Sequence, residues 1–187
     1  IRDIINVINA GCKSPDQAVW AVEGDIQGCF DNISHRILLQ KVWRMGIHDK
    51  RVLKIISQML KAGYIERDLY HKTETGTPQG GILSPLLSNI YLNDFDWYVG
   101  RTYMEPHRKC KHKCNDTRRL KWAGTTPKYN FRYADDWVVL TSTEKEAFRM
   151  KRELTKYFRQ KLKLELSQEK TYVTDLRKGG IHFLGYI

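Results

Sequence analysis

The chain has 187 residues, of which 41% are apolar, and carries a formal net charge of +11. This length predicts one domain, or two lobes that share a core, while the charge favours nucleic acid as the first partner and a membrane surface as the second. Four cysteines are too few for a disulfide framework, no signal peptide is visible, and no apolar run approaches the ~20 residues of a membrane span.

The first half of the chain alternates helical and extended patterns. Residues 19–26 form an apolar run that ends at Asp25 and predicts a strand. Ser84 and Pro85 have the serine cap and first-turn proline of a helix start. The spacing of apolar residues, and glycines where a helix would end, predict helices at 1–8, 34–45, 49–63 and 84–99. Between them we expect an extended stretch at 64–72 and a glycine-rich loop at 75–81.

Residues 101–132 differ from the rest of the chain in charge. They hold ten Lys or Arg and two acids, a net of +8, with Tyr103, Leu120 and Trp122 as the expected apolar anchors. We expect this segment to lie along nucleic-acid phosphates outside the active site. The basic side chains expected to make these contacts are Arg108, Lys109, Lys111, Lys113, Arg118 and Arg119.

The same segment contains four side chains of the types that bind zinc. Cys110 and Cys114 are interleaved with His107 and His112, so a zinc site is an alternative. The interleaved order is not the paired spacing of common zinc motifs. A basic helix or loop on phosphates is therefore the preferred interpretation.

The last third of the chain predicts a hairpin, a helix and short strands. Apolar stretches at 129–132 and 137–141 flank a polar tip, as in a tight hairpin. Thr143 and Glu146 have the spacing of a capping box that opens a helix. Strands are expected at 164–166, 172–176 and 181–187. Helices between antiparallel strands predict an α+β fold, with the sheet covered on one face by helices.

Carboxylates follow two of the expected strands at the points where they end. Asp25 ends the first strand, and Asp135 and Asp136 form the tip of the hairpin. If the two strands pair, these like charges lie close together and require a cation. Mg²⁺ binds one or two carboxylates together with substrate phosphates. The sequence therefore predicts a phosphoryl-transfer site in outline, although acidic residues at a turn often have no function.

Five sequence blocks follow one another along the chain: Asp25–Ile33, Thr77–Leu92, Tyr133–Asp136, Leu166–Thr171 and Phe183–Tyr186. In this order they resemble the conserved blocks of reverse transcriptases. The motif Asp-x-x-x-Cys-Phe-Asp-Asn-Ile at 25–33 and the run Gly-Gly-Ile-Leu-Ser-Pro-Leu-Leu at 80–87 are typical of the reverse transcriptases encoded by group II introns, the maturase family.

The resemblance implies a fingers-palm fold with an antiparallel palm sheet. Residues 1–18 and 33–80 are then part of the fingers, and 19–32 and 81–187 are the palm, with a basic insertion at about 101–130. We expect a piece of a longer protein, because the N-terminal finger blocks, the thumb and any maturase or endonuclease domain are missing, and Ile1 is not an initiator methionine.

The resemblance also implies catalytic roles. Two Mg²⁺ ions, for which Mn²⁺ is a substitute, are expected on Asp25, Asp135, Asp136 and the Ile26 backbone carbonyl. Lys170 is a candidate general acid for the leaving pyrophosphate, although it is also one more lysine in a basic protein.

Further residues are implied to contact the substrates. An aromatic ring at Phe30 excludes the 2′-hydroxyl of a ribonucleotide, unless it is simply a core residue. Gln79 and Gly80 are expected beside the templating base pair. The remaining implied contacts are Tyr133 and Ala134 with the substrate, and Phe183, Leu184 and Gly185 with the primer.

The function implied is RNA-directed DNA polymerisation by a group II intron protein, coupled in the full-length protein to intron splicing and mobility. The partners are then an RNA template, a DNA primer, dNTPs and intron RNA, with no membrane. The alternatives are an RNA-binding maturase without catalysis, or a reverse transcriptase of a retron or a diversity-generating element. The expected location is the cytoplasm of a bacterial host, or an organelle of a eukaryotic one.

Overall fold

The computed structural model describes residues 19–61, 64–66, 69–71, 75–77, 81–104 and 129–185. The chain forms two compact units. The first, called here the sheet unit, comprises Ile1–Asp25, Phe95–Lys156 and Leu166–Ile187. The second, the helical unit, comprises Ile26–Asp94 and Tyr157–Glu165. The expected helix at 1–8, the residues Gln79 and Gly80, and most of the basic segment lie outside the described residues.

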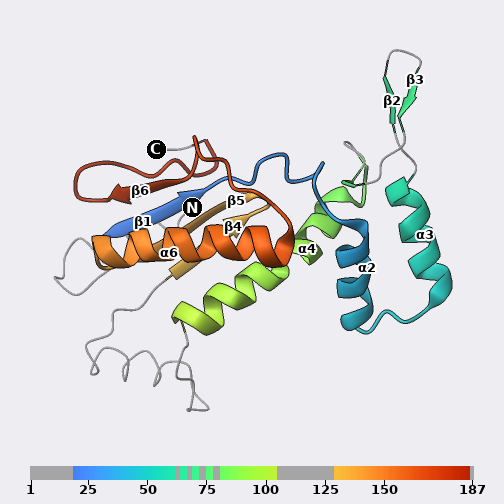
Figure 1. The fold of residues 1–187 in the computed structure, drawn as a ribbon, viewed down its shortest axis with the longest axis horizontal. Coiled ribbons are helices and arrows are strands. Elements are labelled where there is room, and N and C mark those ends of the chain that lie inside the picture. Colours follow the sequence, from blue (N-terminus) through green and yellow to red (C-terminus); the bar gives the residue numbers. More distant parts are fainter. Residues whose placement is uncertain are drawn as a thin grey trace. The chain divides into compact units, whose positions relative to one another are not determined.

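A four-stranded antiparallel sheet forms the centre of the sheet unit, in the order β4-β5-β1-β6 (Figure 1). Its strands are β1 Trp20–Gly24, β4 Tyr129–Tyr133, β5 Asp136–Thr141 and β6 Tyr172–Asp175. β5 pairs with β4 on one side and with β1 on the other. The predicted hairpin, the first strand and the strand at 172–176 are therefore confirmed.

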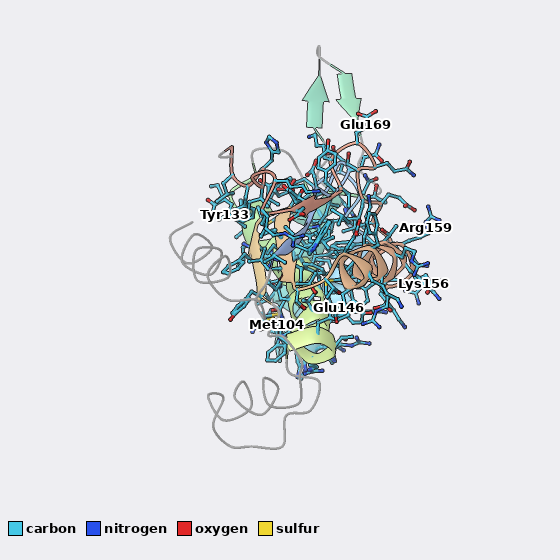
Figure 2. The ribbon with its side chains drawn as sticks, turned by 90° about the vertical axis from the view of Figure 1, so that its left-hand side faces the viewer. Met104, Tyr133, Glu146, Lys156, Arg159 and Glu169 are labelled. Carbon is cyan, nitrogen blue, oxygen red and sulfur yellow. The ribbon has the colours of Figure 1, made fainter. Side chains whose placement is uncertain are left out.

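Helices cover one face of this sheet. α6, Glu144–Tyr157, lies against it in both Figure 1 and Figure 2, in which Glu146 and Lys156 of α6 are labelled. The Thr141 hydroxyl at the end of β5 donates to the Glu146 carboxylate at 2.9 Å, and the Trp137 ring lies 5.3 Å from the Phe95 ring of α4. The α+β prediction, with helices on one face, is thus confirmed.

The opposite face carries a small apolar cluster. Alternation along β5 places Val138 and Leu140 on this face, together with Ala21 of β1. Ile181 and Phe183, from the segment that follows β6, complete the cluster. The end of the described chain therefore covers the face that the helices leave free.

The helical unit contains two amphipathic helices, α2 and α3, and a short hairpin. Ser34 accepts a hydrogen bond from the Ile37 backbone at the start of α2, and Asp49 accepts one from Arg51 before α3. Both predicted helix starts are confirmed. The elements are α2 His35–Arg44, α3 Lys50–Lys61, β2 Tyr64–Glu66, β3 Leu69–His71 and η2 Phe158–Leu162.

The helix predicted at 84–99 is α4, Ser84–Val99, which continues into a π-helical turn, η1, Gly100–Met104. At the end of that turn the buried Tyr103 hydroxyl donates to Glu153 of α6. Burial and the negative Glu153 carboxylate both raise the pKa of Tyr103. The expected anchor at the start of the basic segment is therefore present. The other two, Leu120 and Trp122, lie outside the described residues.

Two strand predictions are wrong. At 164–166 only Leu166 makes a bridge, because Lys163 adopts a left-handed conformation and the Leu164 N–H bonds to the Phe158 carbonyl at 3.1 Å, closing η2. Within 181–185 the chain turns at Leu184 and Gly185, which both have positive φ, so no strand runs through it. In the described ranges no helix is long and apolar enough to cross a membrane.

Candidate active site

The end of β1 meets the tip of the β4–β5 hairpin. Gly24 of β1 pairs with Trp137 of β5. Asp25 directly follows Gly24, and Asp136 directly precedes Trp137, so the two carboxylates lie at the same end of the paired strands. At the tip Tyr133 pairs with Asp136, and the two-residue turn is Ala134-Asp135. The antiparallel register therefore brings all three carboxylates to one edge of the sheet, as the alternating patterns predicted.

These carboxylates interact electrostatically. Partial burial raises the pKa of Asp136, and the negative charges of Asp135 and Asp25 raise it further. The Leu184 backbone N–H and the Lys170 ammonium oppose this shift. The site thus holds excess negative charge that a cation would stabilise.

Lys170 lies beside the same cluster. Its ammonium is 3.1 Å from the Asp25 carboxylate, and this contact raises the pKa of Lys170. The turn that carries Lys170 is held to the end of β1, because the Ser167 N–H donates to the Asp25 backbone carbonyl at 2.9 Å. The Lys170 side chain is 70% exposed, so it can reach a ligand in solvent.

The donor set suits Mg²⁺, which accepts carboxylate oxygens and completes its coordination with water and substrate phosphates. Across the described ranges, no three His, Cys, Asp or Glu side chains converge closely enough to form a metal site by themselves. The meeting of Asp25, Asp135 and Asp136 at paired strand ends is the observation that fits a divalent cation at this edge.

Replacing Asp136 with asparagine should stabilise the fold at neutral pH without divalent ions. A carboxyl whose folded pKa is raised favours folding below its unfolded pKa and loses that contribution as the pH rises through the folded value. We expect Asp136→Asn to raise the unfolding midpoint by a few degrees at pH 7 and to leave it unchanged near pH 3. A thermal scan in EDTA measures this, and equal midpoints at pH 7 would contradict the repulsion.

A partly buried arginine stabilises the turn of the hairpin. Arg132 of β4 donates to Asp96 of α4 through Nε at 2.9 Å and Nη2 at 2.7 Å. Its Nη1 also donates to the Ala134 carbonyl at 2.7 Å. Ala134 has a φ of 53°, which is uncommon for a residue other than glycine. Arg132 therefore stabilises the strained turn that carries Asp135.

Replacing Arg132 with methionine removes these hydrogen bonds but retains the length of the side chain. We expect the free energy of unfolding to fall by about 1–3 kcal/mol, because Asp96 is left partly buried without its partner. Arg149→Met is the matched control, since its pair with Glu153 is exposed and 3.8 Å long; its effect should stay within ~0.5 kcal/mol. Urea unfolding compares the two, and equal effects would show that Arg132 is not a support.

Comparison with known proteins decides the family. The family described as "Reverse transcriptase (RNA-dependent DNA polymerase)" matches residues 1–187. This chain belongs to the reverse transcriptase family. It is 38% identical to the group II intron-encoded protein LtrA of Lactococcus lactis, over 90% of this chain and 35% of that protein. It is 34% identical to the protein YkfC of Escherichia coli, over 89% of this chain and 46% of that protein.

Solved structures share the fold. The telomerase of Candida albicans, in complex with the TWJ fragment of telomeric RNA, matches 98% of this chain and 32% of its own, with a TM-score of 0.64 at 14% identity. The apo telomerase of Candida tropicalis matches 95% of this chain and 32% of its own, with a TM-score of 0.61. This reverse transcriptase chain therefore spans about a third of the length of LtrA and of these telomerases.

The helical unit carries the residues expected to contact the nucleotide and template. Phe30, half-buried, lies in the turn before α2, and its carbonyl accepts the Thr77 N–H at 2.7 Å. The Asn32 amide closes this turn on the Gln27 and Gly28 carbonyls, both at 3.1 Å. The side chain of Ile26 is buried. The turn thus ties the start of the glycine-rich loop to Phe30, while Gln79 and Gly80 lie outside the described residues.

Two residues near the carboxylates were missed by the sequence analysis. Arg132 was counted with the basic segment and with the strand at 129–132, and Glu23 only as part of an apolar strand. A charged residue inside an apolar strand is a signal for a buried hydrogen-bonded group, and Glu23 is only 4% exposed.

Tyr133, labelled in Figure 2, is 66% exposed and projects from the hairpin beside Asp136.

Proposed function

We propose that this chain is the palm and part of the fingers of an RNA-directed DNA polymerase encoded by a group II intron. The observation that carries the proposal is the meeting of Asp25, Asp135 and Asp136 at paired strand ends, where partial burial and the charges of the other two carboxylates raise the pKa of Asp136. The 38% identity to LtrA supports the group II intron origin. The boundaries between fingers and palm, expected after residues 18, 32 and 80, stay a prediction.

The carboxylates act by binding divalent ions, together with the Ile26 backbone carbonyl. Bound Mg²⁺ would activate the primer 3′-hydroxyl and offset the charge that develops on the leaving pyrophosphate. Lys170 holds a proton on its ammonium beside Asp25 and donates it to the leaving pyrophosphate. The hydrogen bond to Asp25 raises the pKa of Lys170, so the ammonium carries its proton at neutral pH.

The substrates are a dNTP, a primer and an RNA template. Phe30 selects against the 2′-hydroxyl, while Gln79 and Gly80 lie beside the templating base pair. Tyr133 and Ala134 contact the reacting nucleotide. The turn at Phe183, Leu184 and Gly185 holds the primer end. We place the activity in the cytoplasm of a bacterial host, or in an organelle of a eukaryotic one.

Primer extension by the full-length protein tests the function. With an RNA template, a DNA primer and Mg²⁺, the protein should add dNTPs and should discriminate against rNTPs. EDTA should stop the reaction, and Mn²⁺ should restore it. RNA binding without any extension would contradict the polymerase and would favour the maturase that binds intron RNA without catalysis.

The basic segment gives a prediction that separates RNA binding from catalysis. Replacing Arg108, Lys109, Lys111 and Lys113 with alanine should weaken RNA binding across sequences. The slope of log K against log salt should flatten by about 0.7 for each single-strand phosphate that the variant no longer neutralises. Filter binding of RNA over a range of KCl measures the slope. An unchanged slope would mean that these side chains face water or another protein, and not nucleic acid.

A further inference from the structure

Glu23 is a buried carboxylate that no catalytic role explains. It lies on β1 two residues before Asp25, on the face that carries the apolar cluster, and is 4% exposed. An ionised carboxylate at such a position is costly unless hydrogen-bond donors surround it. Two donors reach it: the Thr174 hydroxyl of β6, and the His182 backbone N–H at 2.6 Å from Oε2.

The second donor belongs to the segment 181–185, which ends in a strained turn. Leu184 and Gly185 have φ values of 55° and 74°, the signs required at the two central residues of a type I′ turn. Leucine in this conformation costs roughly 1–2 kcal/mol. Surrounding contacts must therefore hold the turn in place.

The strands that carry the catalytic carboxylates supply such contacts. Glu23 of β1 accepts the His182 N–H, and the Leu184 backbone N–H is near enough to Asp136 of β5 to lower the pKa of that carboxyl. Carboxylates on adjacent strands thus interact with the backbone of one segment. Phe183, between them, packs into the apolar cluster.

The turn and the carboxylates also line one cavity. Its volume is about 780 Å³, and its walls include Glu23, Asp25, Asp136, Phe183 and Leu184. Residues of the catalytic edge and residues of the turn thus border the same space. A displacement of the turn therefore changes the shape of the catalytic site.

We propose that Glu23 is a positioning residue, which holds the segment 181–185 at a fixed distance from the catalytic carboxylates and so aligns the primer 3′-terminus. This inference rests on the proposed polymerase function. It assigns Glu23 no contact with substrate or metal. Its role depends on the reach and hydrogen-bonding capacity of the side chain, and its negative charge is dispensable.

The chemistry of the side chain makes this distinction testable. Glutamine has the same reach, and its amide can accept from His182 while donating to the Thr174 hydroxyl, which can reverse its role. Aspartate keeps the charge but is one methylene shorter. Alanine leaves the His182 N–H without an acceptor. Positioning therefore predicts that Glu23→Gln resembles the wild type, whereas Glu23→Asp and Glu23→Ala are impaired.

Pre-steady-state primer extension by the full-length protein measures the effect. The burst amplitude reports the active fraction, which a merely structural defect would lower, and the burst rate reports alignment of the primer. We expect Glu23→Asp and Glu23→Ala to reduce the burst rate about 10- to 100-fold, as for a displacement of about 1 Å. The KM for dNTP should stay within threefold of the wild-type value in all variants. The burst rates of Glu23→Gln and of the exposed control Glu165→Ala should also stay within threefold of the wild-type rate.

Hydrogen exchange of the His182 amide tests the anchor without activity. Exchange should rise in Glu23→Ala and Glu23→Asp and stay low in Glu23→Gln. If the wild type binds RNA but makes no DNA, the polymerase proposal fails, while exchange still decides whether Glu23 anchors the segment. Unchanged amide exchange in all variants would overturn the positioning role. A low burst rate in Glu23→Gln together with a normal burst rate in Glu23→Asp would also overturn it. If Glu23→Ala does not fold, Glu23→Asp and Glu23→Gln decide.

Discussion

Replacing Asp135 with asparagine should reduce the rate of DNA synthesis on an RNA template by at least about 10³-fold. The variant lacks a charged metal ligand that contributes several kcal/mol to stabilising the transition state. Each ~1.4 kcal/mol of activation free energy changes the rate tenfold. Asp135 lies in the two-residue turn, beside Asp136 and within electrostatic range of it. Asparagine has nearly the same shape, so the turn should be retained. Single-turnover extension by the full-length protein measures the decrease.

Two controls make this result specific. Glu144→Gln removes an exposed carboxylate at the start of α6 and should leave the rate unchanged. Affinity for the RNA template should survive in Asp135→Asn, because the basic side chains that we expect to bind phosphates lie elsewhere. Near-normal extension by Asp135→Asn would remove this residue from the metal site.

Replacing Gly24 with alanine should impair both folding and catalysis. An added Cβ would lie 2.2 Å from Cζ2 and 2.5 Å from Cε2 of the Trp137 indole. Trp137 is buried against Phe95 and cannot move away easily. Overpacking of this kind costs about 1–3 kcal/mol and occasionally more. Because Gly24 directly precedes Asp25, relief of the clash by a shift of β1 would also move the carboxylate.

A double-mutant cycle tests the cause of this effect. Trp137→Phe removes the indole atoms that meet the new Cβ, so Gly24→Ala should cost less in that background. Gly100→Ala is the control, because nothing lies within 4 Å of a Cβ built there. Urea unfolding and primer extension give the two readouts. Additive effects of Gly24→Ala and Trp137→Phe would show that the clash is not responsible.

The arrangement of the catalytic edge could be predicted because it depends on local pattern. Alternation fixed the strands around Tyr133–Asp136, and the antiparallel register then placed Asp25 beside Asp136. Helix starts at Ser34 and Asp49 followed from side chains that cap their own backbone. The strands and the helix starts are each decided within a few residues of the chain, whereas the pairing of β1 with β5 joins distant residues and was predicted only on the condition that the two strands meet.

The supports of that edge could not be predicted, because they join distant residues. Glu23 meets the backbone of His182, and Arg132 meets Asp96, across separations that no periodicity encodes. Lys163 adopts a left-handed conformation although its sequence neighbours alternate like a strand. At 181–185 the strand-like pattern instead reflects side chains that cover the apolar cluster. Tertiary contacts override local preference at each of these positions.

Binding of Mn²⁺ tests most directly whether Asp25 and Asp135 hold catalytic ions. The full-length protein, with a primer on an RNA template and a non-hydrolysable dNTP, is titrated with Mn²⁺ and followed by electron paramagnetic resonance. The wild type should bind two ions tightly, and Asp25→Asn with Asp135→Asn should abolish tight binding while the template stays bound. Two tightly bound ions in the double variant, or none in a wild type that extends the primer, would contradict the metal assignment.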